Sequence, residues 1–175
     1  MIFSTLDTLV TIVHFRHFLL LKFLADRTLG KLAKLLRTLG CDTVYYRGED
    51  PRQLTEAAHQ QGRTLLTRNA RLIPKEPGDD ILIVEDDDPH LQLRSLIKRR
   101  VLSLEDLRPF TRCLLCNTLL KPIPQADAEG KVPDHVFYHE KEFYQCPDCS
   151  RIYWRGSHHE NMQKWLNEFF ARPAT

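Results

Sequence analysis

Residues 21–37 read LKFLADRTLGKLAKLLR, and this stretch decides how the rest of the chain is organised. It opens with a short, mostly apolar run that is typical of a buried β-strand. After Asp26, leucine and alanine recur at the spacing of one helix face, at Leu29, Leu32, Ala33, Leu36 and Leu39. The stretch therefore predicts a strand that ends at an acidic residue and leads at once into an amphipathic helix.

Asp26 and the basic residues after it suggest an edge that binds a polyanion. Arg27, Lys31 and Lys34 fall opposite the apolar helix face, and Arg37 lies beside them. In open α/β sheets, ligands bind at the carboxyl ends of the strands. A carboxylate there, next to several cations, suggests a metal-dependent site. The alternative is that Asp26 is the N-cap of the helix, a common place for aspartate.

The chain beyond this helix continues to alternate between strand and helix signals. Apolar and β-branched runs predict strands, and segments with helical periodicity bounded by proline or glycine predict helices. The expected strands are residues 43–46, 64–67 and 81–84, and the expected helices are residues 51–58 and 89–100. This βαβαβαβ order predicts an α/β fold, a parallel sheet flanked by helices.

Polar residues recur where each expected strand ends. They are Asp26, Glu49, Asp50, Asn69, Asp86, Asp87 and Asp88. Parallel strands bring these positions to one edge, where clustered carboxylates repel one another unless a cation lies between them or their pKa values shift. Oxygen ligands without nearby cysteine favour Mg²⁺ or Mn²⁺. The alternatives are that Asp50 caps the helix that begins at Pro51, and that the last three aspartates form only a solvated turn.

Length and composition are those of an ordinary soluble protein. The chain has 175 residues, 42% of them hydrophobic and 27% charged, which suits one domain of about 100 residues with a smaller module beside it. A formal net charge of +2 is too small to indicate nucleic-acid binding by itself. Five cysteines, four of them in Cys-x-x-Cys pairs, indicate zinc in a reducing compartment such as the cytoplasm rather than disulfides.

Residues 1–20 are apolar but match neither a membrane span nor a signal peptide. His14 and Arg16 would be costly in a bilayer core, and the basic start and cleavage site of a signal peptide are missing. We therefore expect residues 1–20 to be an N-terminal extension outside the fold, followed by a domain over residues 21–110. A further hypothesis is that translation begins near Leu21 at a non-standard start codon.

Two Cys-x-x-Cys pairs define a second module, expected over residues 111–175. Each pair can form a knuckle that offers two thiolates. Together they supply the ligands of a tetrahedral zinc site, Cys113, Cys116, Cys146 and Cys149. Four protein ligands leave no open position, so the zinc is predicted to be structural. A module of this size buries too little apolar surface to fold without its metal.

The rest of this module carries weaker patterns. Residues 132–138 include Val132, Val136 and Phe137, and they are expected to form a strand or hairpin. Near the C-terminus, aromatic residues at helical spacing, among them Trp165 and Phe169, predict a helix that packs into a core.

Six motifs along the chain occur together in one known family. They are FLADRTLGKLA at residues 23–33, LR-x-LG-x-DT at 36–43, GR-x-LLTR at 62–68, QL at 92–93, RC-x-x-CN at 112–117 and YW-x-GSH at 153–158. With these motifs in family order, the chain resembles the Mut-seven-C RNase domain family, a PIN-like nuclease domain fused to a C-terminal zinc ribbon. The resemblance implies a PIN-like parallel sheet flanked by helices, a small zinc ribbon and a metal-dependent ribonuclease activity.

The resemblance also implies roles for single residues. It places the carboxylate after the family's first strand at Asp26, while acids near Asp42 and Asp50 and after the last strand match less closely. The family motif has an aspartate after Leu-Leu-Thr-Arg, where this chain has Asn69. Asparagine offers a carbonyl oxygen to a metal but no negative charge, so the site is expected to hold Mg²⁺ less tightly.

These observations predict a cytoplasmic, Mg²⁺- or Mn²⁺-dependent endoribonuclease that does not associate with membranes. Its expected catalytic residues are Asp26, Asp50, Asn69 and Asp86, and the three aspartates are the expected ligands of the catalytic metal. The residues expected to hold RNA phosphates are Arg27, Lys31, Lys34 and Arg68. The alternative, which Asn69 favours, is a non-catalytic module that binds RNA or the ribosome. A third possibility is a protein-interaction module built on the zinc ribbon.

Overall fold

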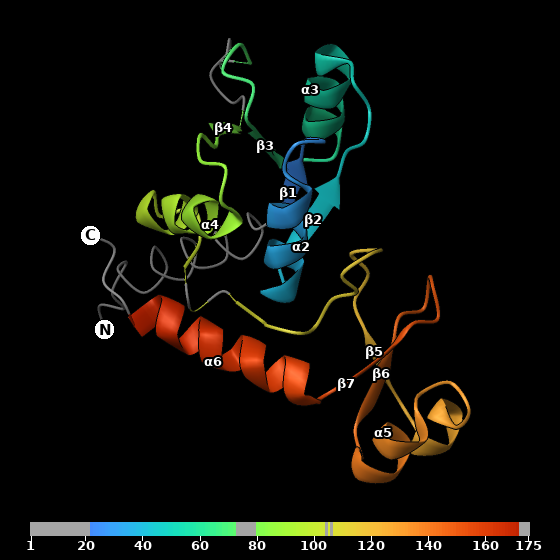
Figure 1. Cartoon of the computed structure of the whole chain (residues 1–175). Coiled ribbons are helices and arrows are strands. Elements are labelled where there is room, and N and C mark those ends of the chain that lie inside the picture. Colours follow the sequence, from blue (N-terminus) through green and yellow to red (C-terminus); the bar gives the residue numbers. More distant parts are fainter. Residues whose placement is uncertain (1–21, 73–79, 104, 106, 172–175) are drawn as a thin grey trace, which may run out of the picture. The chain divides into compact units, whose positions relative to one another are not determined.

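The computed structural model describes residues 22–72, 80–103, 105 and 107–171 (Figure 1). The expected extension over residues 1–20 lies outside them. The chain divides into two compact units that meet in sequence between Phe110 and Thr111. Each unit contains its own sheet.

The first unit is built on a parallel sheet of four strands. The strands are β1 (Lys22–Ala25), β2 (Asp42–Tyr45), β3 (Thr64–Thr67) and β4 (Ile81–Ile83), and their order across the sheet is β2-β1-β3-β4. The helices are α2 (Gly30–Thr38) between β1 and β2, α3 (Pro51–Gln60) between β2 and β3, and α4 (Pro89–Lys98) after β4. The predicted α/β class, with a parallel sheet flanked by helices, is therefore confirmed.

The helices α2 and α3 lie on opposite faces of this sheet. Successive side chains of a strand point to opposite faces. Tyr45, the last residue of β2, lies against Gly30 at the start of α2. Tyr46, by contrast, packs on the buried cluster that joins α3 to the sheet, formed by Leu24, Leu54, Ala58 and Leu65. On its own face, α2 also packs beside α4.

The apolar stripe of α2 is buried as its spacing predicts. Leu32 and Leu36 have no exposed surface, and each such leucine contributes roughly 1.5–3 kcal/mol of hydrophobic stabilisation. Lys31 and Lys34 are exposed, as expected. Arg37 was expected beside these exposed basic residues, and this prediction is wrong. Its side chain is buried, and its Nε donates to the carbonyl of Thr43 at 2.8 Å. Arg37 lies in the last turn of α2, where the chain folds back to form β2, so the start of that strand covers it.

A second arginine ties the strands together at their amino ends. Arg63, just before β3, donates from Nη1 to Asp42 Oδ1 at 2.8 Å, to the Asp42 carbonyl at 3.2 Å and to the Phe23 carbonyl at 3.4 Å. Asp42 is the first residue of β2. Since the strands are parallel, Asp42 lies at the opposite edge of the sheet from the residues that follow the strands. It therefore cannot join a site at the carboxyl edge.

The second unit contains a three-stranded antiparallel sheet. Its strands are β5 (Lys121–Ile123), β6 (Phe143–Gln145) and β7 (Ile152–Trp154), in the order β5-β6-β7. A 3₁₀ helix η2 (Gln125–Ala128) and a short helix α5 (Asp134–His139) lie between β5 and β6, and α6 (Ser157–Ala171) follows β7. Phe169 on α6 is buried and contacts the ring of Trp165, with 4.9 Å between ring centroids.

The strand or hairpin expected over residues 132–138 is wrong, because this segment contains α5. Pro133 precedes the helix and Asp134 occupies its first turn, where a negative charge is favourable. Val132 and Val136, four residues apart, pack with Ala128 on the ring of Phe143. Val136 lies on α5 and Val132 just before it, so both valines reach Phe143 although this segment is not a strand.

Within the described part of the chain, no helix combines the length and the hydropathy that crossing a bilayer requires.

Candidate functional site

Asp26 lies at the point where the chain direction across the sheet reverses. It directly follows β1, whose connection leads to β2 on one side, while β3 lies on the other side. In doubly wound α/β sheets, ligands bind beyond the carboxyl ends of the strands at this switch point. The Asp26 amide donates to the Leu66 carbonyl at 3.0 Å, and only 6% of the residue is exposed.

The carboxylate of Asp26 accepts four hydrogen bonds from two loops. Oδ1 accepts from the Thr28 amide at 2.8 Å and from the Thr28 hydroxyl at 2.6 Å. Oδ2 accepts from the Thr67 hydroxyl and from the Arg68 amide, the latter at 3.2 Å. These donors fill the lone-pair sites of a carboxylate. Asp26 is not the N-cap of α2, because Leu29 occupies that position without a side-chain cap bond. Asp26 instead links the ends of β1 and β3.

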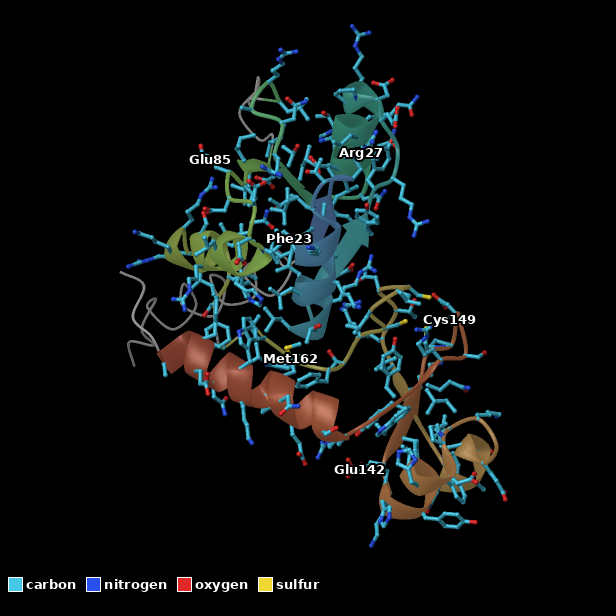
Figure 2. The ribbon with its side chains drawn as sticks, viewed as in Figure 1. Phe23, Arg27, Glu85, Glu142, Cys149 and Met162 are labelled. Carbon is cyan, nitrogen blue, oxygen red and sulfur yellow. The ribbon has the colours of Figure 1, made fainter. Side chains whose placement is uncertain are left out.

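Charges alternate along this edge on both sides of Asp26. Arg27 forms an ion pair with Glu49, which follows β2. Arg68 forms an ion pair with Asp87, which follows β4. All four side chains of these pairs are partly exposed. Figure 2 shows Arg27 and Glu85 at the same end of the sheet, beyond the strand that carries Phe23. The carboxyl edge therefore offers two arginines to an incoming polyanion, each already paired with an acid.

Two of the other aspartates expected at this edge, Asp50 and Asp88, act as helix N-caps. Asp50 is exposed and caps α3, because its side chain accepts from the Arg52 amide at 2.8 Å. Asp88 caps α4 in the same way, accepting from the His90 amide at 2.7 Å. Asp86 is partly buried, and its carbonyl accepts from the Gln92 side chain at 2.6 Å. The structure therefore supports the alternative role of Asp50, which is to cap the helix that begins at Pro51.

Asn69 is held in the turn after β3. Its amide donates to the Thr67 hydroxyl oxygen at 3.0 Å, and its Oδ1 accepts from the Arg71 amide at 3.1 Å. The Thr67 hydroxyl therefore joins Asn69 to Asp26. Thr67 and Thr28 are the residues of this edge that the sequence reasoning missed. A threonine two residues after an aspartate and another at a strand end are local signals that could have identified them.

The acids of this edge do not form a preassembled metal cage. Within the described ranges, no three of them bring ligand atoms as close together as the four cysteines do. Mg²⁺ is nevertheless often bound through one or two carboxylates together with water and substrate phosphates. The two threonine hydroxyls on Asp26 can rotate and release a lone pair to a cation. The residues present thus fit a cation that is held partly by substrate.

The four cysteines of the second unit have the geometry of a zinc site. Their Sγ atoms all lie within 4.8 Å of one another, and those of Cys113 and Cys149 are 3.7 Å apart. Tetrahedral zinc with Zn–S bonds of about 2.3 Å requires sulfurs about 3.8 Å apart. The ligand type, number and spacing all fit structural zinc.

Both cysteine pairs form the same backbone turn. Asn117 donates to the Cys113 carbonyl and Ser150 donates to the Cys146 carbonyl, each at 2.9 Å. Asn117 and Ser150 have φ angles of 70° and 57°, in the left-handed region. Burial raises the pKa of Cys113, but hydrogen bonds from Tyr153 and from backbone amides outweigh it and lower the pKa to about 6. Loss of the thiol proton is therefore favoured at Cys113, whereas the neighbouring sulfurs raise the pKa of Cys116 and burial raises that of Cys146.

Ser150→Gly is expected to stabilise the zinc-loaded protein by about 1 kcal/mol, because a left-handed φ is strained for serine and not for glycine. Thermal unfolding in the presence of zinc measures this effect. Asn117→Gly is the matched control at the other turn and should gain less, because asparagine tolerates this conformation. A lower unfolding temperature for Ser150→Gly would contradict the prediction.

Comparison with known proteins gives one match. A family model described as the Mut7-C RNAse domain matches residues 21–166, which covers both the parallel sheet and the four cysteines. Neither the curated proteins nor the solved structures contain a match to the chain.

Proposed function

The chain belongs to the Mut7-C RNAse domain family, and from this premise we propose that it hydrolyses phosphodiester bonds of RNA with a divalent metal ion. A nuclease-like function that acts on RNA follows from the family; the metal dependence and the endonucleolytic cleavage are our proposal.

The observation that carries this proposal is the position of Asp26. It is a buried carboxylate at the carboxyl edge of a parallel sheet, and it lies at the switch point between β1 and β3. Buried carboxylates are rare unless their oxygens are bound, and their presence in a ligand-binding crevice is typical of functional sites. Of the acids expected at this edge, Asp26 is the one that is buried within the described part of the chain.

The chain's own residues would bind and orient the RNA. Four exposed basic side chains can hold phosphates by charge. Arg27 follows β1, Arg68 follows β3, and Lys31 and Lys34 lie on α2. Asp26 would contribute the first metal ligand, with Asp50 or Asp86 as further acidic partners. When bound, Mg²⁺ or Mn²⁺ would polarise the phosphoryl oxygen and lower the pKa of the attacking water.

A non-catalytic RNA-binding module is the second candidate, and three observations favour it. Asn69 supplies no negative charge, the oxygens of Asp26 are all occupied, and the described acids do not gather around a common point. On this alternative, the arginines and lysines of the edge still bind RNA, but no bond is cleaved.

Cleavage of single-stranded and structured RNA in Mn²⁺ separates the two candidates. We expect slow cleavage by the wild type that a chelator abolishes, and cleavage about tenfold faster with Asn69→Asp, since a metal site gains a charge. Asn167→Asp, on the exposed side of α6, introduces the same charge elsewhere and should change nothing. Activity confined to Asn69→Asp would indicate a nuclease site weakened by one missing charge. RNA binding without cleavage by either protein would establish the non-catalytic module.

We also propose a cytoplasmic location and a partner for the zinc ribbon. Zinc held by free thiolates requires a reducing compartment. Leu115 and Leu119, next to the first cysteine pair, are 54% and 56% exposed. They could contact a protein partner or the ribosome while the first unit binds RNA.

A further inference from the structure

Tyr153 connects the two halves of the zinc site. It lies in the middle of β7, shortly after the second cysteine pair. Its hydroxyl nevertheless reaches the first pair, where it lies 3.1 Å from the Sγ of Cys113. The amide of Leu114 donates to the same hydroxyl oxygen at 3.3 Å. One side chain thus joins the sheet to a knuckle that comes forty residues earlier in the chain.

The direction of these hydrogen bonds follows from the chemistry of a bound zinc. A zinc-bound cysteine is a thiolate, so its sulfur can only accept. A phenol is protonated at neutral pH, so Tyr153 donates to Cys113 and uses its oxygen lone pair for the Leu114 amide. The hydroxyl can therefore satisfy both contacts while Cys113 is a thiolate, by donating to the sulfur and accepting from the Leu114 amide.

The sulfur of Cys113 receives two donors from the protein. One is the Tyr153 hydroxyl, and the other is the Cys116 amide, at 3.4 Å. Four thiolates around one divalent ion carry a net negative charge, and hydrogen bonds to sulfur spread that charge. A donor from another part of the fold also fixes the direction of the sulfur. Such partners of metal ligands typically change metal affinity by about 10- to 100-fold.

We propose that Tyr153 is a positioning residue for zinc, whose hydroxyl orients the Cys113 sulfur and sets how tightly the ribbon retains its metal. This inference rests on the zinc site described above and is independent of whether the first unit cleaves RNA. The competing explanation is that Tyr153 only fills space with its ring. Replacement by phenylalanine distinguishes the two, because it removes the hydroxyl and keeps the ring.

The test measures zinc affinity of the full chain by competition with a chromophoric chelator, for the wild type, Tyr153→Phe and Tyr138→Phe. Tyr153→Phe should bind zinc about 10- to 100-fold more weakly and lose it faster to excess chelator. Tyr138, on α5, is 78% exposed, so Tyr138→Phe should match the wild type within about twofold.

Two further readouts keep the test decisive. In zinc-loaded Tyr153→Phe, hydrogen exchange at the Leu114 amide should be faster, and the sulfur-to-metal absorption of the Co²⁺-substituted protein should shift. Complete failure of Tyr153→Phe to retain zinc, with Tyr138→Phe intact, would support the role more strongly. Equal zinc affinities for Tyr153→Phe and wild type would overturn it, and a wild type that binds no zinc would overturn the zinc site itself.

Discussion

Asp26→Ala is expected to abolish RNA cleavage and to lower the free energy of unfolding of the first unit. The carboxylate is the proposed centre of the nuclease site, and it also accepts four hydrogen bonds that alanine cannot replace. The Thr67 hydroxyl and the Arg68 amide would lose their partner at the end of β3. Each buried donor left without an acceptor costs about 1–3 kcal/mol, so the loss of stability should be clear in denaturant unfolding.

RNA affinity separates catalysis from folding in this experiment. Removal of a negative charge near phosphates should leave the affinity of the folded protein unchanged or slightly higher. Asp88→Ala is the matched control, because it removes an aspartate of the same edge that caps α4. It should cost about 1 kcal/mol of stability and retain cleavage. Cleavage by a folded Asp26→Ala protein at the wild-type rate would contradict the proposed role of Asp26.

Removal of zinc is expected to unfold the second unit. The apolar cluster beside its sheet is small, consisting of Ala128, Val132, Val136 and Phe143 with a few partly buried neighbours. In small zinc modules, metal binding contributes about 10–16 kcal/mol at neutral pH, and this energy is also folding energy. A strong chelator should therefore eliminate the amide protection of β5, β6 and β7, and zinc should restore it.

The parallel sheet provides the internal control for this experiment. Residues of β1 and β3 lie in the other unit and bury their own apolar side chains, so their amides should stay protected after chelation. Cys146→Ser should reproduce the effect of the chelator without one being added, because it removes one ligand. A second unit that keeps its protected amides in metal-free buffer would show that the four cysteines do not hold it together.

The outcome of each sequence prediction depends on how far apart in the chain the relevant contacts are. The strand and helix patterns around Asp26 are local, and the structure contains them within a residue or two. The cysteine spacing is also decisive, because two close pairs fix the ligand type and number. The strand or hairpin expected over residues 132–138 is wrong, because the β-branched composition suggests a strand, whereas Pro133 and Asp134 begin a short helix from which Val136 packs against Phe143.

By itself, the sequence determined the α/β class, the position of Asp26 at a strand end and the four cysteines that could hold zinc, because each depends on short-range periodicity or spacing. Only the tertiary structure decided which side chains meet. It buried Arg37 and placed Asp42 at the opposite edge. Contacts such as Thr67 with Asp26 and Tyr153 with Cys113 join segments about forty residues apart. They arise from strand order and register, which no local pattern contains.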